Sequence, residues 1–164
     1  MRGKRAKKHT LVPDAKFNSL TVAKLINYLM LDGKKSIATN IVYDAMEGLD
    51  SKVKENKEGV KIKLTSLEAL DSAIDNVKPR LEIRSRRVGG ANYQIPVPVS
   101  PDRQTALAMK WIIGAARDGR KKSNLAESLK NELSLALNNQ GIAIKKKEDT
   151  QKMADANKAF AQFA

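Results

Sequence analysis

The sequence predicts a mainly α-helical protein, a six-helix bundle with one protruding two-stranded antiparallel β-ribbon. Six segments carry apolar residues at the three- and four-residue spacing of a helix. Two segments alternate in polarity instead, and a glycine pair separates them. The chain of 164 residues is long enough to bury a core as one domain. We place a basic N-terminal arm at 1–18, a single helical domain at 19–164, and the ribbon at about 80–99.

The first three helices follow from their apolar spacing and end signals. One is predicted over 20–31, with Asn18 or Ser19 as the cap and Asp32-Gly33 as the stop. The next is predicted over 36–49. Residues 51–64 are rich in lysine and glutamate and are predicted to form a loop. The third helix opens with the capping box Thr65-x-x-Glu68 and ends before Pro79.

The ribbon prediction depends on glycine and proline. Gly89-Gly90 accepts the positive φ angles of a tight hairpin turn. Pro96 and Pro98 have the same parity, so their missing N–H groups fall on one edge of the second strand. That edge must be free of a further strand. The sequence therefore predicts a two-stranded ribbon, which needs support from the helices or from a partner.

The last three helices follow the ribbon. Ser100-Pro101 opens a helix that ends near Gly119, and its apolar stripe includes Trp111, predicted to be a core residue. Ser123 is the predicted cap of the next helix, which ends at 139–141. The final helix is predicted over about 147–163.

Composition excludes several classes of function. The 31 Lys and Arg residues exceed the 18 Asp and Glu residues, which gives a net charge of +13. There is no cysteine, and the one histidine, His9, lies in the basic N-terminal segment. We therefore expect no enzyme activity, no metal site and no cofactor. No transmembrane helix or signal peptide is evident, so we expect a cytoplasmic protein with no membrane partner. The excess charge predicts a polyanionic partner.

Basic residues gather in clusters. Four of the nine arginines lie within residues 80–87, and arginine's planar fork suits phosphate better than lysine does. Tyr93 lies in the same ribbon and is expected either to stack on a base or to pack on the helices. Seven aromatic residues are too few for several stacking platforms, so phosphate and shape contacts should dominate. The predicted RNA-contacting residues are Arg2, Lys4, Arg5, Lys7, Lys8, Lys34, Lys35, Arg80, Arg84, Arg86, Arg87, Tyr93, Arg103, Arg120, Lys121, Lys122, Lys145, Lys146 and Lys147.

Three segments carry a resemblance to a known family. Residues 78–96, KPRLEIRSRRVGGANYQIP, closely resemble the β-arm segment of small-subunit ribosomal protein seven in its bacterial form. The motif DGKK at 32–35, followed by IVYDA at 41–45, looks like that family's N-terminal signature. The motif KKKED at 145–149, with MADAN at 153–157, looks like its C-terminal helix. The matches fall in order and span nearly the whole chain.

The resemblance implies a structural constituent of the small ribosomal subunit. Members of this family are six-helix proteins with a β-ribbon. They bind the 3′ major domain of ribosomal RNA and nucleate assembly of the subunit head. They lie at the subunit interface near the exit-site transfer RNA and contact the ninth and eleventh small-subunit proteins. Some also repress translation of their own messenger RNA.

One alternative remains open at the level of the sequence. A DNA-binding architectural or regulatory protein would share the basic charge and the ribbon, since ribbons also enter DNA grooves. Relative affinity for a structured ribosomal RNA junction and for duplex DNA separates the two. A nucleotide-binding loop is excluded, because Gly33-Lys34-Lys35-Ser36 follows a helix and Tyr28 stands where the motif needs its first glycine.

Overall fold

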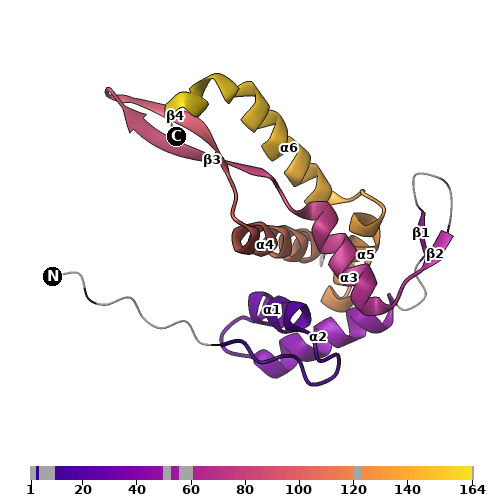
Figure 1. Ribbon diagram of the computed structural model, residues 1–164. Helices are drawn as coiled ribbons and strands as arrows, with labels where there is room; N and C mark the ends of the chain where they lie inside the picture. Colours follow the sequence, from indigo (N-terminus) through magenta and orange to yellow (C-terminus); the bar gives the residue numbers. More distant parts are fainter. Residues whose placement is uncertain (1–2, 4–9, 50–52, 56–60, 120–122, 164) are drawn as a thin grey trace.

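The computed structural model describes residues 3, 10–49, 53–55, 61–119 and 123–163. In this part of the chain, six helices and two short antiparallel sheets are present (Figure 1). This confirms the predicted mainly α-helical fold with a β-ribbon. The helices are α1 (Leu20–Leu29), α2 (Lys35–Glu47), α3 (Ser66–Val77), α4 (Pro101–Gly119), α5 (Leu125–Leu137) and α6 (Ile142–Ala156), and a 3-10 helix η1 (Lys158–Phe163) follows. The strands are β1 (Val53–Glu55), β2 (Lys61–Lys63), β3 (Leu81–Val88) and β4 (Ala91–Pro98).

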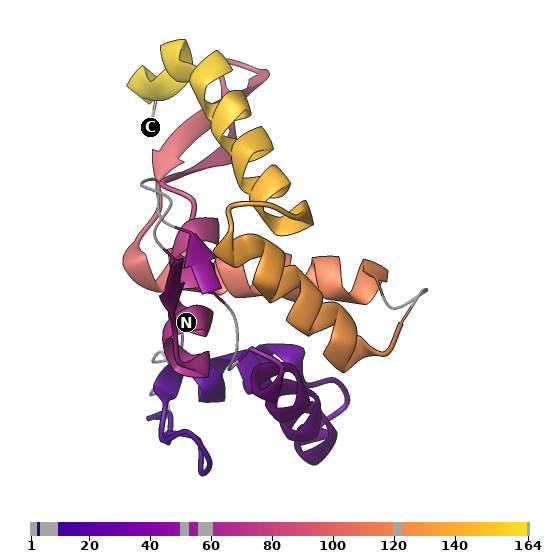
Figure 2. The same ribbon diagram turned by 90° about the vertical axis from the view of Figure 1, so that its right-hand side faces the viewer.

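Helices α4 and α5 lie across the middle of the molecule, between α1 and α2 on one side and the ribbon and α6 on the other (Figure 2). Helix α5 packs against α2, α3, α4 and α6. Each helix buries one apolar stripe, and full burial of a large aliphatic side chain contributes about 1.5–3 kcal/mol. The largest fully buried side chains include Leu25, Met46, Leu70, Ile112 and Leu129.

Two of the predicted helix starts are capped as expected. The Ser19 side chain accepts hydrogen bonds from the N–H groups of Thr21 and Val22, at 3.2 and 3.5 Å. At α3 the capping box is complete, because Thr65 N–H donates to the Glu68 carboxylate at 2.9 Å and Glu68 N–H donates to Thr65 Oγ1 at 3.4 Å. Each cap satisfies helix N–H groups that have no partner within the helix.

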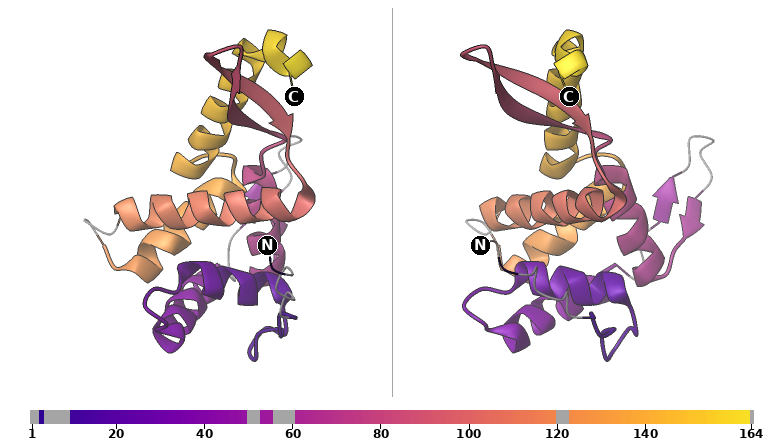
Figure 3. Two further views of the ribbon diagram at one scale, coloured as in Figure 1. Left: turned by 90° about the vertical axis from the view of Figure 1, so that its left-hand side faces the viewer. Right: turned by 60° about the vertical axis from the view of Figure 1, so that its left-hand side comes forward.

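The ribbon of β3 and β4 turns at the predicted glycines. Val88 pairs with Ala91, and Gly89 and Gly90 have φ angles of +58° and +89°, which only glycine adopts readily at both positions of such a turn. The ribbon does not stand alone: α6 packs against β3, and η1 packs against β4 (Figure 3). This is the helical support that an isolated two-stranded ribbon requires.

Several boundaries differ from prediction, including the end of the final helix, where α6 stops at Ala156 and the 3-10 helix η1 follows to Phe163. Within the predicted loop 51–64, β1 and β2 pair antiparallel; three-residue strands are too short for an alternation pattern to be detected. The final helix begins at Ile142 rather than near 147, because the carboxylate of Glu132 on α5 accepts the N–H of Ala143 at 2.8 Å. The fifth helix begins after Asn124, and the Ser123 hydroxyl instead bonds with Ser128 at 2.8 Å.

Trp111 lies at the edge of the core rather than inside it. It is partly buried against the core, whereas Ala108, Met109 and Ile112 of the same helix are fully buried. The apolar stripe of α4 is therefore centred one helical position away from the predicted one. A large ring at this edge still covers part of the core's apolar surface.

Candidate nucleic-acid interface

The arginines of β3 are divided between the two faces of the ribbon. The register places Arg84 opposite Ile95 and Arg86 opposite Tyr93, so these four share one face. Arg87 lies opposite Asn92 on the other face. All three arginines are exposed. The ribbon therefore carries exposed guanidinium groups on both of its faces.

A buried carboxylate joins the ribbon to the helical body. Glu82 is only 7% exposed. Its Oε1 accepts a hydrogen bond from Arg84 Nε at 2.6 Å, and its Oε2 accepts one from Arg103 Nε of α4 at 2.5 Å. Burial opposes ionisation of this carboxyl, but the bonds from Arg103 and Arg84 outweigh burial and hold its pKa below the usual value. Glu82 is therefore ionised at neutral pH.

Lys147 is drawn into the structure at the junction of three helices. Its ammonium donates to the backbone oxygen of Asn76 at 2.5 Å, in the last turn of α3. The Asn76 side chain in turn donates to the backbone oxygens of Ala136 and Leu137, both at 3.0 Å, at the end of α5. Burial and the nearby charge of Arg80 lower the pKa of Lys147. Lys147 therefore links α6 to the end of α3, and its contact with RNA stays a prediction.

The other predicted lysines stand at helix N-termini. Lys34 is the N-cap of α2 and Lys35 is its first residue, while Lys145 lies in the first turn of α6 and Lys146 follows it. All four are exposed. The dipole of a helix disfavours cations at this end and favours anions. Lysines placed there weaken the helix start by themselves, and a bound phosphate would satisfy both the lysines and the helix.

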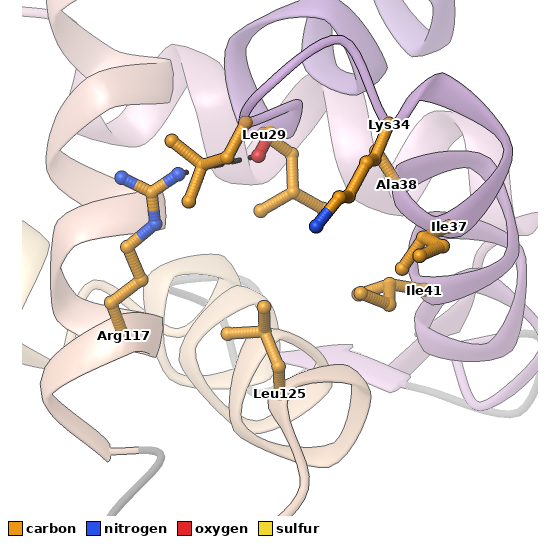
Figure 4. Close-up of a pocket in the computed structure, with 8 residues that line it drawn as sticks. Leu29, Lys34, Ile37, Ala38, Ile41, Arg117 and Leu125 are labelled. Atoms are coloured by element: carbon orange, nitrogen blue, oxygen red, sulfur yellow. Dashed lines mark hydrogen bonds between the residues drawn. The ribbon is translucent and has the colours of Figure 1, made fainter.

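Lys34 and Arg117 border one apolar groove of about 490 Å³ (Figure 4). Arg117, in the last turn of α4, donates through Nη2 to the backbone oxygen of Leu29 at 3.2 Å. The groove thereby brings together two basic side chains that are distant in the sequence. Its lining includes no aromatic side chain, so it offers no surface for base stacking. The remaining lining residues are Leu29, Leu31, Ile37, Ala38, Ile41 and Leu125.

Tyr93 packs within the protein. Its ring lies 5.2 Å from the ring of Phe160 on η1, at an interplanar angle of 54°, a common geometry for stabilising aromatic pairs. Of the two expectations for Tyr93, the structure shows packing: the ring is partly buried and lies against Phe160 of η1. Its contact with RNA stays a prediction.

Some predicted residues lie outside the described part of the chain. These are Arg2, Lys4, Arg5, Lys7 and Lys8 of the N-terminal arm, and Arg120, Lys121 and Lys122 after α4. Residues 14–17 of the same predicted arm are described, and they contact α2. Sequence reasoning missed Glu82, because a search for clusters of positive charge passes over the single acid among them.

Other kinds of site were also considered. Among the residues that the structure describes, no three His, Cys, Asp or Glu side chains gather as a metal-binding group. No helix in the same ranges is long and apolar enough to cross a membrane.

Fold and surface together define a class: a basic, mainly helical protein whose β-ribbon and helix starts carry exposed arginine and lysine. Comparison with known proteins gives the family. The sequence model of the family described as "Ribosomal protein S7p/S5e" matches residues 1–158, and the chain belongs to that family. Members are structural, non-enzymatic proteins of the small ribosomal subunit, so the chain is a ribosomal RNA-binding component of the translation machinery.

The relatives match over nearly their full length. The chain is 49% identical over 162 residues to "Small ribosomal subunit protein uS7" of Caulobacter vibrioides, covering 99% of this chain and 98% of that one. It is 52% identical over 163 residues to the protein of the same description from Thermosipho africanus, covering 99% of each.

Proposed function

We propose that this chain binds the 3′ major domain of small-subunit ribosomal RNA directly and nucleates assembly of the subunit head. In the assembled subunit it would lie at the subunit interface near the exit-site transfer RNA, in contact with the ninth and eleventh small-subunit proteins. Repression of its own messenger RNA would use the same basic surface. The observation that carries the proposal is the ribbon, which presents exposed arginines on both faces and is fixed to the body by Glu82.

The chemistry of these residues supports RNA as the ligand. Guanidinium groups bind phosphate through two parallel hydrogen bonds, and the lysines at the starts of α2 and α6 add charge where helix dipoles already favour anions. Sparse aromatic residues fit recognition by shape and phosphate rather than by stacking. Membership of a ribosomal family argues against the alternative of a DNA-binding architectural protein.

The test compares three polyanions. The chain should bind a transcript of the 3′ major domain more tightly than a transcript of equal length from another ribosomal domain, and more tightly than duplex DNA. Chemical footprinting should place the protected nucleotides within the 3′ major domain. Equal affinity for all three would contradict the proposal.

A variant locates the interaction on the ribbon. Changing Arg84, Arg86 and Arg87 together to alanine removes little apolar area, and Glu82 keeps its hydrogen bond from Arg103, so the melting temperature should fall only modestly. Affinity for the 3′ major domain should fall at least tenfold, since each lost phosphate or base contact contributes about 1–3 kcal/mol. The matched control changes the exposed Lys24, Lys110 and Lys152 to alanine, which removes the same charge away from the predicted clusters. Equal loss in both variants would mean that net charge alone determines binding.

A further inference from the structure

Glu82 is an acid at the centre of the surface that we propose for RNA. Glu82 is the second residue of β3, at the base of the ribbon, and its carboxylate contacts Arg103 in the first turn of α4. Its own negative charge repels phosphate. A carboxylate at this position therefore reduces RNA affinity unless it contributes in some other way.

The two arginines that contact Glu82 come from different elements. Arg84 belongs to the ribbon and Arg103 to the first turn of α4. Each directs its Nε toward one carboxylate oxygen, and Arg84 Nη2 also lies 2.5 Å from Oε1. Both side chains nevertheless remain about half exposed, at 58% and 51%. The Glu82 carboxylate thus holds the inner edges of two guanidinium groups whose outer parts face solvent.

This geometry limits how the arginines can move. A guanidinium group has five N–H donors in a rigid planar fork, so fixing Nε fixes the direction of the remaining donors. An unrestrained arginine on a surface samples many rotamers, and ordering it on binding costs conformational free energy. Arginines that are ordered before binding avoid this cost.

We propose that Glu82 is a positioning residue for RNA recognition: it holds Arg84 and Arg103 so that their outward N–H groups contact one RNA segment across the junction of the ribbon and α4. The role rests on the proposed function. It turns two flexible surface cations into one ordered pair, and the bond from Arg103 also ties the ribbon to the first turn of α4. The gain in specificity outweighs the repulsion from one carboxylate.

The test is a variant for which net charge and positioning of the arginines predict opposite changes in RNA affinity. Glu82→Gln keeps the shape of the side chain and raises the net charge by one, so simple electrostatics predicts tighter binding to every RNA. Positioning predicts that affinity for the 3′ major domain falls about tenfold, equal to about 1.4 kcal/mol, while affinity for a non-specific RNA stays equal or increases. The matched control is Glu127→Gln, which makes the same charge change at an exposed residue of α5. It should leave the preference for the 3′ major domain intact.

A second variant covers the case in which Glu82→Gln does not fold. Arg103→Lys preserves all charges but replaces the fork that Glu82 holds, and it should cause the same selective loss. Footprints of both variants should lose the same protections, and Arg103→Lys should add little to Glu82→Gln when the two are combined. If both folded variants keep the parent's preference, Glu82 has no positioning role. If the parent itself shows no preference among RNAs, the proposed function fails and the positioning role fails with it.

Discussion

At the scale of single residues, Gly141 occupies a position where the φ angle and the neighbouring atoms both disfavour any other residue. It is the N-cap of α6 with φ of +99°, and an added Cβ would lie 2.8 Å from Glu132 Oε1 and 3.1 Å from Leu135 Cβ. Glu132 is the buried carboxylate that accepts the N–H of Ala143. A side chain at residue 141 would both strain the backbone and displace the Glu132 carboxylate that caps α6.

We therefore expect Gly141→Ala to lower the free energy of unfolding by about 1–3 kcal/mol. The matched control is Gly114→Ala in the interior of α4, where the nearest atom to a new Cβ, Lys146 Nζ, is 3.8 Å away. That change should stabilise the protein by about 0.5–1 kcal/mol, because alanine favours the helix. Urea unfolding of both variants measures the difference. Similar stabilities would show that neither the φ angle nor the Glu132 contact is important.

The sequence predicts residue roles well where the partner is near in the chain and poorly where it is distant. The capping box of Thr65 and Glu68 is local, and the structure has it as predicted. The cap of α6 comes from Glu132, and the partner of Lys147 is Asn76, 71 residues earlier. No spacing rule links such pairs. The same holds for Glu82 and Arg103, whose pairing depends on the angle at which β3 meets α4.

At the scale of elements, the segment before α1 is partly fixed to the body. The Asp14 carboxylate accepts hydrogen bonds from the Tyr43 hydroxyl at 2.7 Å and from Phe17 N–H at 3.1 Å. The Phe17 and Tyr43 rings meet edge to face at 5.7 Å. Burial opposes ionisation of Asp14, but the Tyr43 and backbone bonds outweigh it and lower its pKa. These contacts link the predicted arm to α2.

Two truncations separate the anchored part of this segment from the rest. Deleting residues 1–16 removes Asp14 and its partly buried hydrogen bonds to Tyr43 and Phe17, and we expect the free energy of unfolding to fall by about 1–2 kcal/mol, given about 1 kcal/mol for each such bond. Deleting residues 1–9 keeps Asp14 and should leave the melting temperature unchanged. Both deletions should weaken RNA binding through lost charge. A parent-like melt for the longer deletion would mean that the contacts with α2 contribute nothing to stability.

Helix and ribbon positions follow from the sequence more fully than their boundaries do. The glycine turn and the paired prolines define the ribbon, because the glycines permit the positive φ angles of the turn and each proline removes an N–H from one strand edge. The strands β1 and β2 are too short for sequence alternation to predict them. The start of α6 is not predicted correctly because its capping carboxylate comes from another helix, α5. The support that α6 and η1 give the ribbon depends on packing between elements, which periodicity does not encode.

At the scale of the whole molecule, basic clusters far apart in the sequence are held on one rigid scaffold. Lys34 and Arg117 border one groove, Glu82 joins the ribbon to Arg103, and Lys147 joins α6 to α3. A scaffold of this kind lets several clusters contact one folded RNA at once. Its binding energy should then depend on how many phosphates are neutralised together.

This predicts a steep salt dependence. If six to ten phosphates are contacted, affinity for the 3′ major domain should fall by about 10³–10⁵ between 50 and 200 mM salt, by analogy with duplex DNA. Because the clusters would act on one RNA, each phosphate contact that is removed should lower the slope of log K against log salt by a similar step of about 0.7–0.9. Changing Lys34 and Lys35 to alanine and changing the three ribbon arginines to alanine should therefore reduce the slope additively, since the two sites share no contact. Filter binding over a salt series measures all four combinations. A slope near zero for the parent would contradict the electrostatic mechanism, and a slope unaffected by either variant would place the phosphate contacts on other residues.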